Sequence, residues 1–248
     1  MRCQARRITR MSKINFHIGT SGYGYKEWKG SFYPTDLSAS QMLDYYGRRF
    51  RTVEINNTFY RMPTASSLAA LTQQVPSDFQ FVLKAPQWIT HFQRLRGAEE
   101  SVGQFLDAAK ALKRKLGPLL FQLPGNFKKD LPRLRDFLAI LPSKQRVAFE
   151  FRHASWLDEE IFTLLRKKKV ALCVAEAKDG IETSLVSTAP WGYLRLRMAD
   201  YSDRALKSWI TRIGQQNWRD VYVFFKHEDE GKGPRFAARL LELCRQSP

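Results

Sequence analysis

Charged side chains end several apolar segments of this chain, at the points where strand-forming sequence gives way to polar sequence. The clearest case is "VAFEFRHASW" at 147–156, which starts as a buried strand and then presents Glu150, Arg152 and His153. A carboxylate can transfer a proton, and a guanidinium group grips phosphate or carboxylate through two parallel hydrogen bonds. If this strand end opens into a shared polar space, the residues indicate a site for an anionic ligand.

Eight apolar segments of this kind recur along the 248 residues, and most are rich in Val, Ile, Leu or Phe, as strands are. We expect strands at 16–20, 52–56, 79–84, 118–123, 146–151, 170–175, 191–197 and 221–226. Helical periodicity fills most of the gaps. We expect helices within 38–49, 64–74, 98–115, 130–140, 156–168, 203–213 and 234–245. The gap at 176–190 is too short and polar for a full helix.

Strand–helix alternation repeated eight times predicts an α/β fold, a single (β/α)8 TIM-like barrel with long, aromatic-rich loops after the strands. A doubly wound open sheet is the alternative, but "GTSGYG" at 19–24 lacks the spacing of its Gly-rich turn. We expect one barrel domain over 14–248. A basic extension at 1–13 precedes it, and we expect this extension to be disordered or its first ten residues to lie upstream of a true start at Met11.

The alternation of side chains along a strand assigns each charged residue to the barrel interior or to the helix layer. In 52–56 the apolar residues suit the helix layer, so Glu54 and Asn56 point inward. We expect the inward polar residues to meet at the C-terminal mouth, where barrel active sites lie. The expected mouth residues are Glu54, Asn56, Lys84, Gln122, Glu150, Arg152, Glu176, Arg195, Arg197 and, with ambiguous parity, Lys226.

Five cations and three carboxylates among these residues leave two positive charges in excess. Because burying an unpaired ion is costly, the excess favours an anionic ligand. We expect Glu150 or Glu176 to be the general base or acid, with Glu54 beside them, and the arginines and lysines to bind the ligand. The alternative is that pairs such as Glu54–Arg195 and Glu150–Arg152 only close the barrel.

Aromatic residues in the loops after the strands can stack on bases or sugars. They are Tyr23, Tyr25, Trp28, Phe59, Tyr60, Trp88, Phe92, Trp156 and Tyr201, and His153 lies among them. The net charge of +17 adds an expected attraction to polyanions, nucleic acid first. Glu150, Glu176, His153 and His227 are the candidate ligands for a divalent metal, but no H-x-x-x-H or H-E-x-x-H pair supports one, and the sequence names no cofactor.

Composition narrows the class of protein further. No apolar segment reaches the roughly 18 residues of a membrane span, and the N-terminus lacks the apolar region of a secretory signal. The three cysteines, Cys3, Cys173 and Cys244, are too far apart for a disulfide framework or a metal knuckle. We therefore expect a cytoplasmic protein with no membrane partner, and the oligomeric state stays open.

Several segments resemble the DUF72, or YecE-like, family from about residue 14 onward. They are "GTSGYGYKEWKGSFYP" at 19–34, "VEINNTFYRMPT" at 53–64, "FVLKAPQWITH" at 81–91, "GPLLFQLPGNF" at 117–127, "FEFRHASW" at 149–156 and "YLRLR" at 193–197. The resemblance implies a TIM-barrel-like fold and no particular activity, since the family is named for unknown function. The end "FFKHEDEGKGPRFA" departs from the Asn-rich eighth strand associated with many members, so no role is carried over to it.

The residues favour a phosphoester-acting enzyme, a phosphodiester or phosphomonoester hydrolase, on nucleic acid or a nucleotide-like anion. One alternative is a non-catalytic nucleic-acid-binding protein that uses the same mouth. The other is an enzyme on a sugar phosphate or another small anion, with the mouth closed to polymers. The substrate class rests on charge and aromatic residues, because barrels host many chemistries.

Overall fold

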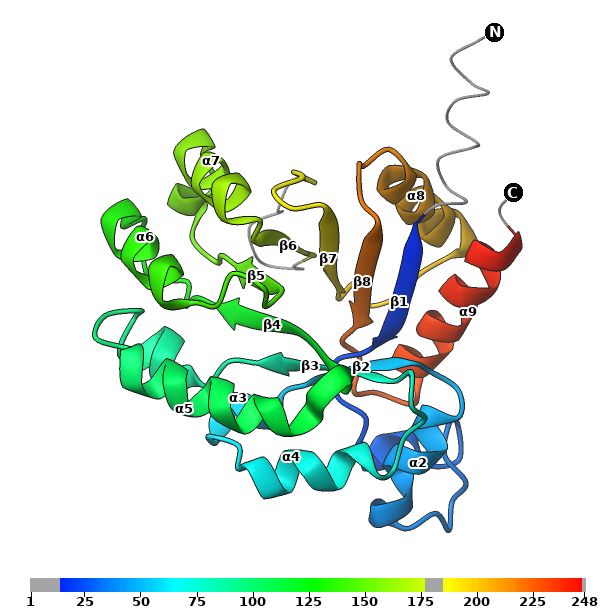
Figure 1. Cartoon of the computed structure of the whole chain (residues 1–248). Coiled ribbons are helices and arrows are strands. Elements are labelled where there is room, and N and C mark those ends of the chain that lie inside the picture. Colours follow the sequence, from blue (N-terminus) through cyan, green and yellow to red (C-terminus); the bar gives the residue numbers. More distant parts are fainter. Residues whose placement is uncertain (1–13, 177–184, 247–248) are drawn as a thin grey trace, which may run out of the picture.

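Eight parallel strands form a nearly closed barrel in the computed structural model of the chain, and helices surround it (Figure 1). The structure describes residues 14–176 and 185–246. The strands are β1 (Asn15–Thr20), β2 (Thr52–Ile55), β3 (Gln80–Lys84), β4 (Leu116–Gln122), β5 (Val147–Glu150), β6 (Ala171–Ala175), β7 (Trp191–Leu196) and β8 (Asp220–Phe225). Their order around the sheet is β1-β8-β7-β6-β5-β4-β3-β2. The predicted barrel is confirmed, and the open doubly wound sheet is not formed.

Helices follow the strands and cover the outside of the barrel (Figure 1). They are α2 (Met42–Gly47), α3 (Asn57–Tyr60), α4 (Ala65–Thr72), α5 (Glu99–Ala109), α6 (Leu131–Ile140), α7 (Glu159–Lys168), α8 (Asp203–Gly214) and α9 (Lys232–Gln246). Shorter helical turns are η1 (Lys26–Trp28), η2 (Ala39–Gln41), η3 (Trp88–Phe92), η4 (Lys110–Lys115) and η5 (Ala154–Trp156). The expected helices are all present. Most of the short helical turns were not predicted from the sequence, because segments this short cannot show helical periodicity.

Side-chain caps fix the start of several helices. Asp130 accepts a hydrogen bond from the Arg133 N–H at the start of α6, and Asp158 accepts one from the Ile161 N–H at the start of α7. The first N–H groups of a helix have no partner within the helix, so each cap stabilises by about 1 kcal/mol. The capped ends lie on the side of the barrel where the strands end, and they anchor the loops that carry the candidate site.

Two hydrophobic cores lie on opposite faces of the sheet. The core inside the barrel includes Val82, Leu120, Ala148, Tyr193 and Phe224. The larger core between the barrel and the helices includes Phe81, Leu119, Phe149, Leu194 and Phe225. Successive residues of a strand thus alternate between the two cores. A polar residue two positions beyond an inner-core residue is therefore directed into the mouth of the barrel.

The β1–β2 junction is the weakest seam of the barrel. The two strands share a single bridge, Ser21 with Glu54, instead of a ladder. The buried Tyr46 hydroxyl spans the seam: it accepts from the Thr20 N–H at 2.9 Å and donates to the Thr52 carbonyl at 3.0 Å. A Cβ added to Gly19 of β1 would lie 2.2 Å from the Thr52 carbonyl oxygen, so the glycine allows β1 and β2 to approach each other closely here.

Replacing Tyr46 by phenylalanine is expected to lower the free energy of unfolding by about 1–3 kcal/mol, because a buried N–H and a buried carbonyl lose their partner. Urea denaturation measures this loss. The matched control is Tyr45→Phe, since the Tyr45 hydroxyl forms no hydrogen bond to a described residue. Equal stability of the two variants would show that the Tyr46 hydroxyl does not hold the seam.

Two segments for which the sequence led to an expectation lie wholly or partly outside the described residues. The basic extension at 1–13 and the middle of the 176–190 gap lie outside the described ranges. The described part of that gap contains no helix, as expected. Within the ranges that the structure does describe, no helix combines the length and apolar character that a bilayer crossing requires.

Candidate active site

The expected charged residues meet where the strands of the barrel end. Glu54 of β2, Glu150 of β5 and Arg195 of β7 are almost fully buried, and Arg195 forms an ion pair with each of the two carboxylates. Each occupies the inward parity predicted from the apolar residues around it. Asn56, just beyond β2, is half-buried and immediately precedes α3. The local sequence pattern thus accounts for the charged mouth.

Arg195 is the centre of this network. Its Nη2 lies 2.7 Å from Glu54 Oε1, and its Nη1 lies 2.6 Å from Glu150 Oε2. Glu54 also accepts hydrogen bonds from the hydroxyls of Ser21 and, at 2.5 Å, Tyr193. Buried ions are tolerated when they are both paired and hydrogen-bonded, and both conditions hold here. The expected Glu54–Arg195 pair is therefore part of the barrel interior.

Four side chains donate hydrogen bonds to Glu150. Oε1 accepts from Gln122 Nε2 at 2.7 Å, Arg152 Nε at 3.0 Å and Arg197 Nη2 at 3.1 Å. Oε2 accepts from Arg195 Nη1. A carboxylate has about four lone-pair sites, so this set fills Glu150. Glu150 can take a proton from a ligand only after one of these bonds breaks.

Both buried glutamates are held in the ionised form. Burial alone would raise the pKa of Glu150, but the charges of Arg195, Arg197 and Arg152 outweigh it and hold the pKa well below its usual value. Burial would also raise the pKa of Glu54, and the charge of Arg195 with two hydroxyl hydrogen bonds lowers it instead. These carboxylates suit the positioning of guanidinium groups and do not suit proton donation.

Arg152 and Arg197 keep donors that meet no acceptor in the described part of the chain. Arg152 binds Glu150 through Nε alone and its side chain is 43% exposed, so its two terminal nitrogens are free. Arg197 binds Glu150 through Nη2, and its Nη1 meets no acceptor among the described residues, while its Nε is buried without a partner. Free guanidinium nitrogens are the groups that meet the oxygens of phosphate or carboxylate.

Lys84, the last residue of β3, forms no ion pair with any described carboxylate. The residue is 8% exposed, and its Nζ lies 3.5 Å from the centre of the Phe59 ring. Burial and the charge of Arg195 lower the pKa of Lys84 to about 7, against the opposite effect of Glu150 and Glu54. Near neutral pH this amine is therefore present in both charged and neutral forms.

His91 lies next to Lys84, on the π-helical turn η3 that follows β3. Its ring meets the Phe59 ring edge to face, with 5.0 Å between centroids, and its Nδ1 lies 2.9 Å from Thr90 Oγ1. Burial and the positive charge of Lys84 lower the pKa of His91 to about 4. His91 is thus neutral at pH 7, in surroundings that already hold an excess of cations.

Lys226 follows β8 with inward parity. Phe224 belongs to the inner core and Phe225 to the outer core, which resolves the ambiguity in the sequence. Burial and the charge of Arg195 lower the pKa of Lys226. Lys226, like Lys84, forms no ion pair with a described carboxylate. Two unpaired amines therefore stand beside a network whose carboxylates are already engaged.

Glu176 lies apart from the arginine network. Its Oε1 accepts a hydrogen bond from Trp209 Nε1 at 3.0 Å. Its Oε2 accepts from the Tyr201 hydroxyl and, at 3.3 Å, from the Arg197 backbone N–H. All three donors to this carboxylate are neutral. Their hydrogen bonds connect the end of β6 to the segment before α8 and to α8 itself.

The candidate metal ligands are not brought together. His153 Nδ1 accepts a hydrogen bond from the Ser155 N–H at the start of η5, and His227 Nε2 lies 2.5 Å from the Met198 carbonyl. Throughout the residues that the structure describes, no three His, Cys, Asp or Glu side chains are placed to hold an ion. The four candidate ligands named from the sequence are therefore not assembled into an ion site among the described residues.

The loop aromatics divide into a buried group and an exposed group. Trp28 and Trp156 are fully buried, and their rings stack on Tyr33 and Phe151. This corrects the expectation that they face a ligand: their large apolar area is more favourably placed in the outer core. Tyr25 is half-buried and donates its hydroxyl hydrogen bond to a backbone carbonyl.

Three exposed rings remain beside Lys84, and we call Tyr60, Trp88 and Phe92 the aromatic rim. They are 73%, 56% and 65% exposed, unusual for rings of this size. Phe59 links them, because its ring touches both Tyr60 and His91, and His91 belongs to the same short turn as Trp88 and Phe92. Nearby, Tyr23 lines a pocket of 380 Å³. The mouth thus combines exposed rings with unpaired cations.

Several residues of the network were not singled out from the sequence. Tyr193 could have been, because it precedes Arg195 by two positions on the same strand and shares its parity. Ser21 lies beyond β1 and reaches Glu54 only through the β1–β2 bridge, a contact that no local pattern signals. His91 and Trp209 lie on helical turns that periodicity does not relate to the mouth.

Two curated proteins match this chain in sequence. The chain is 35% identical over 127 residues to the UPF0759 protein YecE of Escherichia coli K12, a match covering 50% of the chain and 47% of YecE. It thus spans about half the length of that relative. It is 25% identical over 230 residues to the UPF0759 protein YunF of Bacillus subtilis 168, covering 86% of the chain and 79% of YunF.

Two solved structures of DUF72 family proteins have the same fold as this chain. A DUF72 family protein from Thermotoga maritima superimposes with a TM-score of 0.81 at 26% identity, over 93% of this chain and 99% of that one. A DUF72 family protein from Enterococcus faecalis gives a TM-score of 0.75 at 18% identity, over 93% and 98% of the two chains, which shows the fold alone. The family described as "Protein of unknown function DUF72" matches residues 17–248. The chain therefore belongs to the DUF72 family.

Proposed function

We propose that the mouth of the barrel is the active site of an enzyme acting on a phosphoester of a nucleotide-like anion. The observation that carries the proposal is the Lys84 amine, which is buried and free of any described carboxylate. The free donors of Arg152 and Arg197 lie in the same mouth. A phosphate group is the kind of ligand that meets both a point charge and planar guanidinium donors.

The aromatic rim supports the nucleotide-like part of the substrate. A base or sugar ring stacked on an exposed aromatic side chain contributes about 1–3 kcal/mol. Trp88 and Tyr60 are exposed beside the Lys84–Phe59 contact. A substrate with a ring at one end and a phosphate at the other matches this arrangement of rim and cations.

The proposal divides the roles among the charged residues. Lys84 transfers the proton, because its pKa of about 7 lets it accept and donate near neutrality. Glu54 and Glu150 position Arg195 and the other guanidinium groups, since their oxygens are already engaged. Glu176, held by neutral donors and not by guanidinium groups, is the second group assigned to acid–base chemistry.

Calorimetric titration with AMP and with inorganic phosphate tests the binding part. AMP should bind about 5–150-fold more tightly than phosphate, which is the stacking contribution converted to affinity. Trp88→Ala should remove most of that difference and leave phosphate affinity unchanged. Met198→Ala is the matched control, because Met198 is an exposed apolar residue without a ring.

Hydrolysis of aryl phosphomonoesters and phosphodiesters tests the catalytic part, and we expect turnover of at least one of the two. The absence of saturable binding of both AMP and phosphate would contradict the proposal. Equal effects of Trp88→Ala and Met198→Ala would remove its nucleotide-like part. Saturable binding without any phosphoester hydrolysis would contradict the enzymatic part.

A further inference from the structure

The end of the barrel opposite the mouth, where the strands begin, carries a concentration of positive charge. The segments that lead into β4, β5, β6 and β8 are 110–115, 141–146, 166–170 and 217–220. They contain eleven Lys or Arg and a single acid, Asp220. Parallel strands begin at the same end of a barrel, and these strands lie within one continuous arc of the sheet. The four segments therefore share one rim.

Some of these cations are engaged. Lys110 pairs with Asp107, Arg146 with Asp220 and Arg166 with Glu159, and the Lys115 amine donates to the carbonyls of Thr72 and Val75. The side chains of the other seven are exposed and have no acid or hydrogen-bond partner within the described ranges. We call these seven the basic face: Lys113, Arg114, Lys144, Lys167, Lys168, Lys169 and Arg219.

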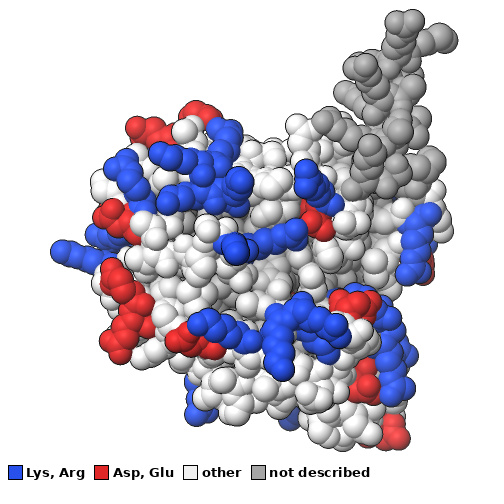
Figure 2. All heavy atoms as spheres, in the orientation of Figure 1, with Lys and Arg blue, Asp and Glu red and all other residues white. Residues whose placement is uncertain are grey.

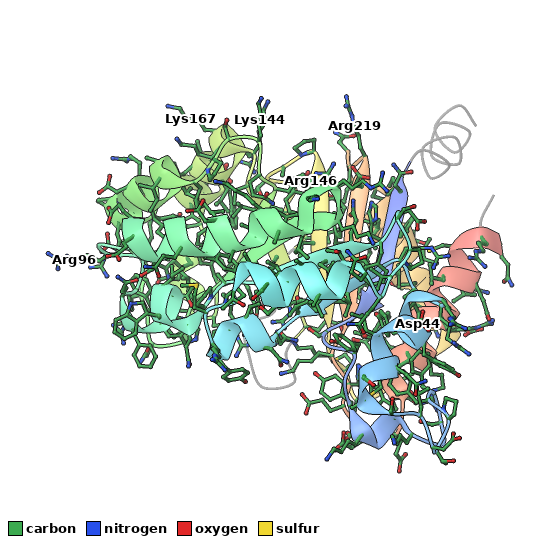
Figure 3. The ribbon with its side chains drawn as sticks, turned by 60° about the horizontal axis from the view of Figure 1, so that its bottom comes forward. Asp44, Arg96, Lys144, Arg146, Lys167 and Arg219 are labelled. Atoms are coloured by element: carbon green, nitrogen blue, oxygen red, sulfur yellow. The ribbon has the colours of Figure 1, made fainter. Side chains whose placement is uncertain are left out.

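The figures show how these side chains stand. In Figure 3 Lys144, Lys167 and Arg219 extend into solvent along the same edge of the molecule, whereas Arg96 extends on a different side. Figure 2 shows Lys and Arg side chains standing out over the part of the surface near α7. The long side chains are therefore presented outward and are not folded back onto neighbouring acids.

Helix dipoles explain only part of this pattern. Cations in the last turn of a helix are favourable, which accounts for Lys167 and Lys168 at the end of α7. The effect fades beyond the last turn. Lys144 lies beyond the end of α6 and Arg219 beyond the end of α8, outside that reach. The helix dipole therefore does not explain why Lys144 and Arg219 are placed at this end of the barrel.

Backbone conformation gives an independent observation. Lys169, at the end of α7, has φ 55° and ψ 34°, and Lys113 has φ 51°. The left-handed helical conformation of Lys169 favours glycine or asparagine, and a helix end such as that of α7 usually places glycine there. The positive φ of Lys113, with ψ −128°, also favours glycine. The chain carries lysine at both turns despite the strain, and both lysines extend the basic face.

We infer that the basic face binds the phosphate backbone of a nucleic-acid double helix. Unpaired lysines and arginines spread over one rim are the groups that neutralise phosphates. Exposed rings, which single strands use for stacking, are absent from the basic face. In the described residues the exposed large apolar side chains are Tyr60, Trp88, Phe92 and Met198, all in the segments that follow the C-terminal ends of strands. The attraction to polyanions expected from the charge of +17 is thereby assigned to the end opposite the mouth, and it does not depend on the proposed function.

Titration of the full chain with a short labelled DNA duplex, the matching RNA duplex and the single strands, over a range of salt, tests the inference. The test variant combines Lys144→Gln, Lys167→Gln, Lys168→Gln and Arg219→Gln. The matched control combines Lys26→Gln, Lys29→Gln, Lys128→Gln and Arg96→Gln, three lysines and one arginine on loops after strands. Each lost phosphate contact makes the slope of log affinity against log salt shallower by about 0.9. We expect a change of about 3–4 for the test variant and little change for the control.

A second variant separates binding from folding. Lys169→Gly removes one charge and relieves the left-handed strain, so the Tm should hold or rise while the salt slope becomes shallower by about 0.9. Equal losses in the test and control variants would overturn the inference, since binding would then be diffuse. Tighter binding of the single strands, or preferential binding of vesicles containing phosphatidylserine, would also overturn it. The DNA and RNA arms report which duplex is preferred.

Discussion

Replacing Arg195 by methionine is expected to lower the free energy of unfolding by about 3–5 kcal/mol, because Glu54 and Glu150 would each lose a buried ionic partner. Methionine keeps the length of the side chain without its charge. Both carboxylates lie at the centre of the mouth with almost no exposure to solvent. Chemical denaturation at pH 7 measures the loss. A loss below about 1 kcal/mol would show that the network relaxes around the missing guanidinium group.

The pH dependence of the same variant gives a second readout. In the unchanged protein the pKa values of Glu54 and Glu150 are lowered, so their contribution is present above the unfolded pKa, roughly 4. It is lost as pH falls through the folded values. Protonated glutamates do not need Arg195, so the deficit of Arg195→Met should narrow at acid pH.

The control for Arg195 is Arg152→Met. Arg152 also binds Glu150, but it is 43% exposed and Glu150 keeps two other guanidinium partners. We expect a loss of less than about 1 kcal/mol. A loss as large as that of Arg195→Met would mean that the total number of partners, and not burial, decides the stability of the network.

Replacing Lys84 by methionine is expected to reduce turnover of the substrate identified at the mouth by about 10²–10⁴-fold, the usual contribution of a general acid or base. If the neutral amine is the base, turnover of the unchanged enzyme should rise as pH increases through about 7, the pKa of Lys84. Kinetics as a function of pH measure both effects. A pH profile that Lys84→Met leaves unchanged would assign the titration to another group.

Lys84→Arg separates charge from proton transfer. Arginine keeps a positive charge at all accessible pH values and cannot act as the base. This variant should retain much of the phosphate affinity while losing turnover. Lys226→Met is the comparison, because Lys226 is a second amine at the same mouth but is exposed; its loss should weaken phosphate affinity and leave the pH dependence of turnover unchanged. Full turnover by Lys84→Arg would leave Lys84 with a purely electrostatic role.

Strand order and side-chain parity could be predicted from the sequence because they depend on local alternation. Glu54, Glu150 and Arg195 lie where that alternation placed them, and the expected pairs Glu54–Arg195 and Glu150–Arg152 are both present. Which carboxylate keeps a free lone pair depends on contacts between strands distant in the chain. The four donors that fill Glu150 come from three different strand ends, and no local pattern counts them.

The aromatic residues show the limit of prediction from composition. Trp28 and Trp88 both lie in loops after strands, yet Trp28 is fully buried and Trp88 is 56% exposed. The difference arises because Trp28 packs within a group of neighbouring rings, whereas Trp88 lies at the outer start of a short π-helical turn. Spacing cannot distinguish the two, since burial depends on what the rest of the fold places above each ring.

The seam between β1 and β2 has a consequence for how the chain is made. β1 pairs with β8 over six residues but with β2 through one bridge, so the ladder partner of the first strand is the last strand. Asn15 and Asp220, which face each other in that ladder, are 205 residues apart. At about 5–20 residues per second, the ribosome needs about 10–40 s to deliver β8 after β1. During that interval β1 lacks its ladder partner, and the Tyr46 hydroxyl bond to the Thr20 N–H acts together with the Ser21–Glu54 bridge to keep it beside β2.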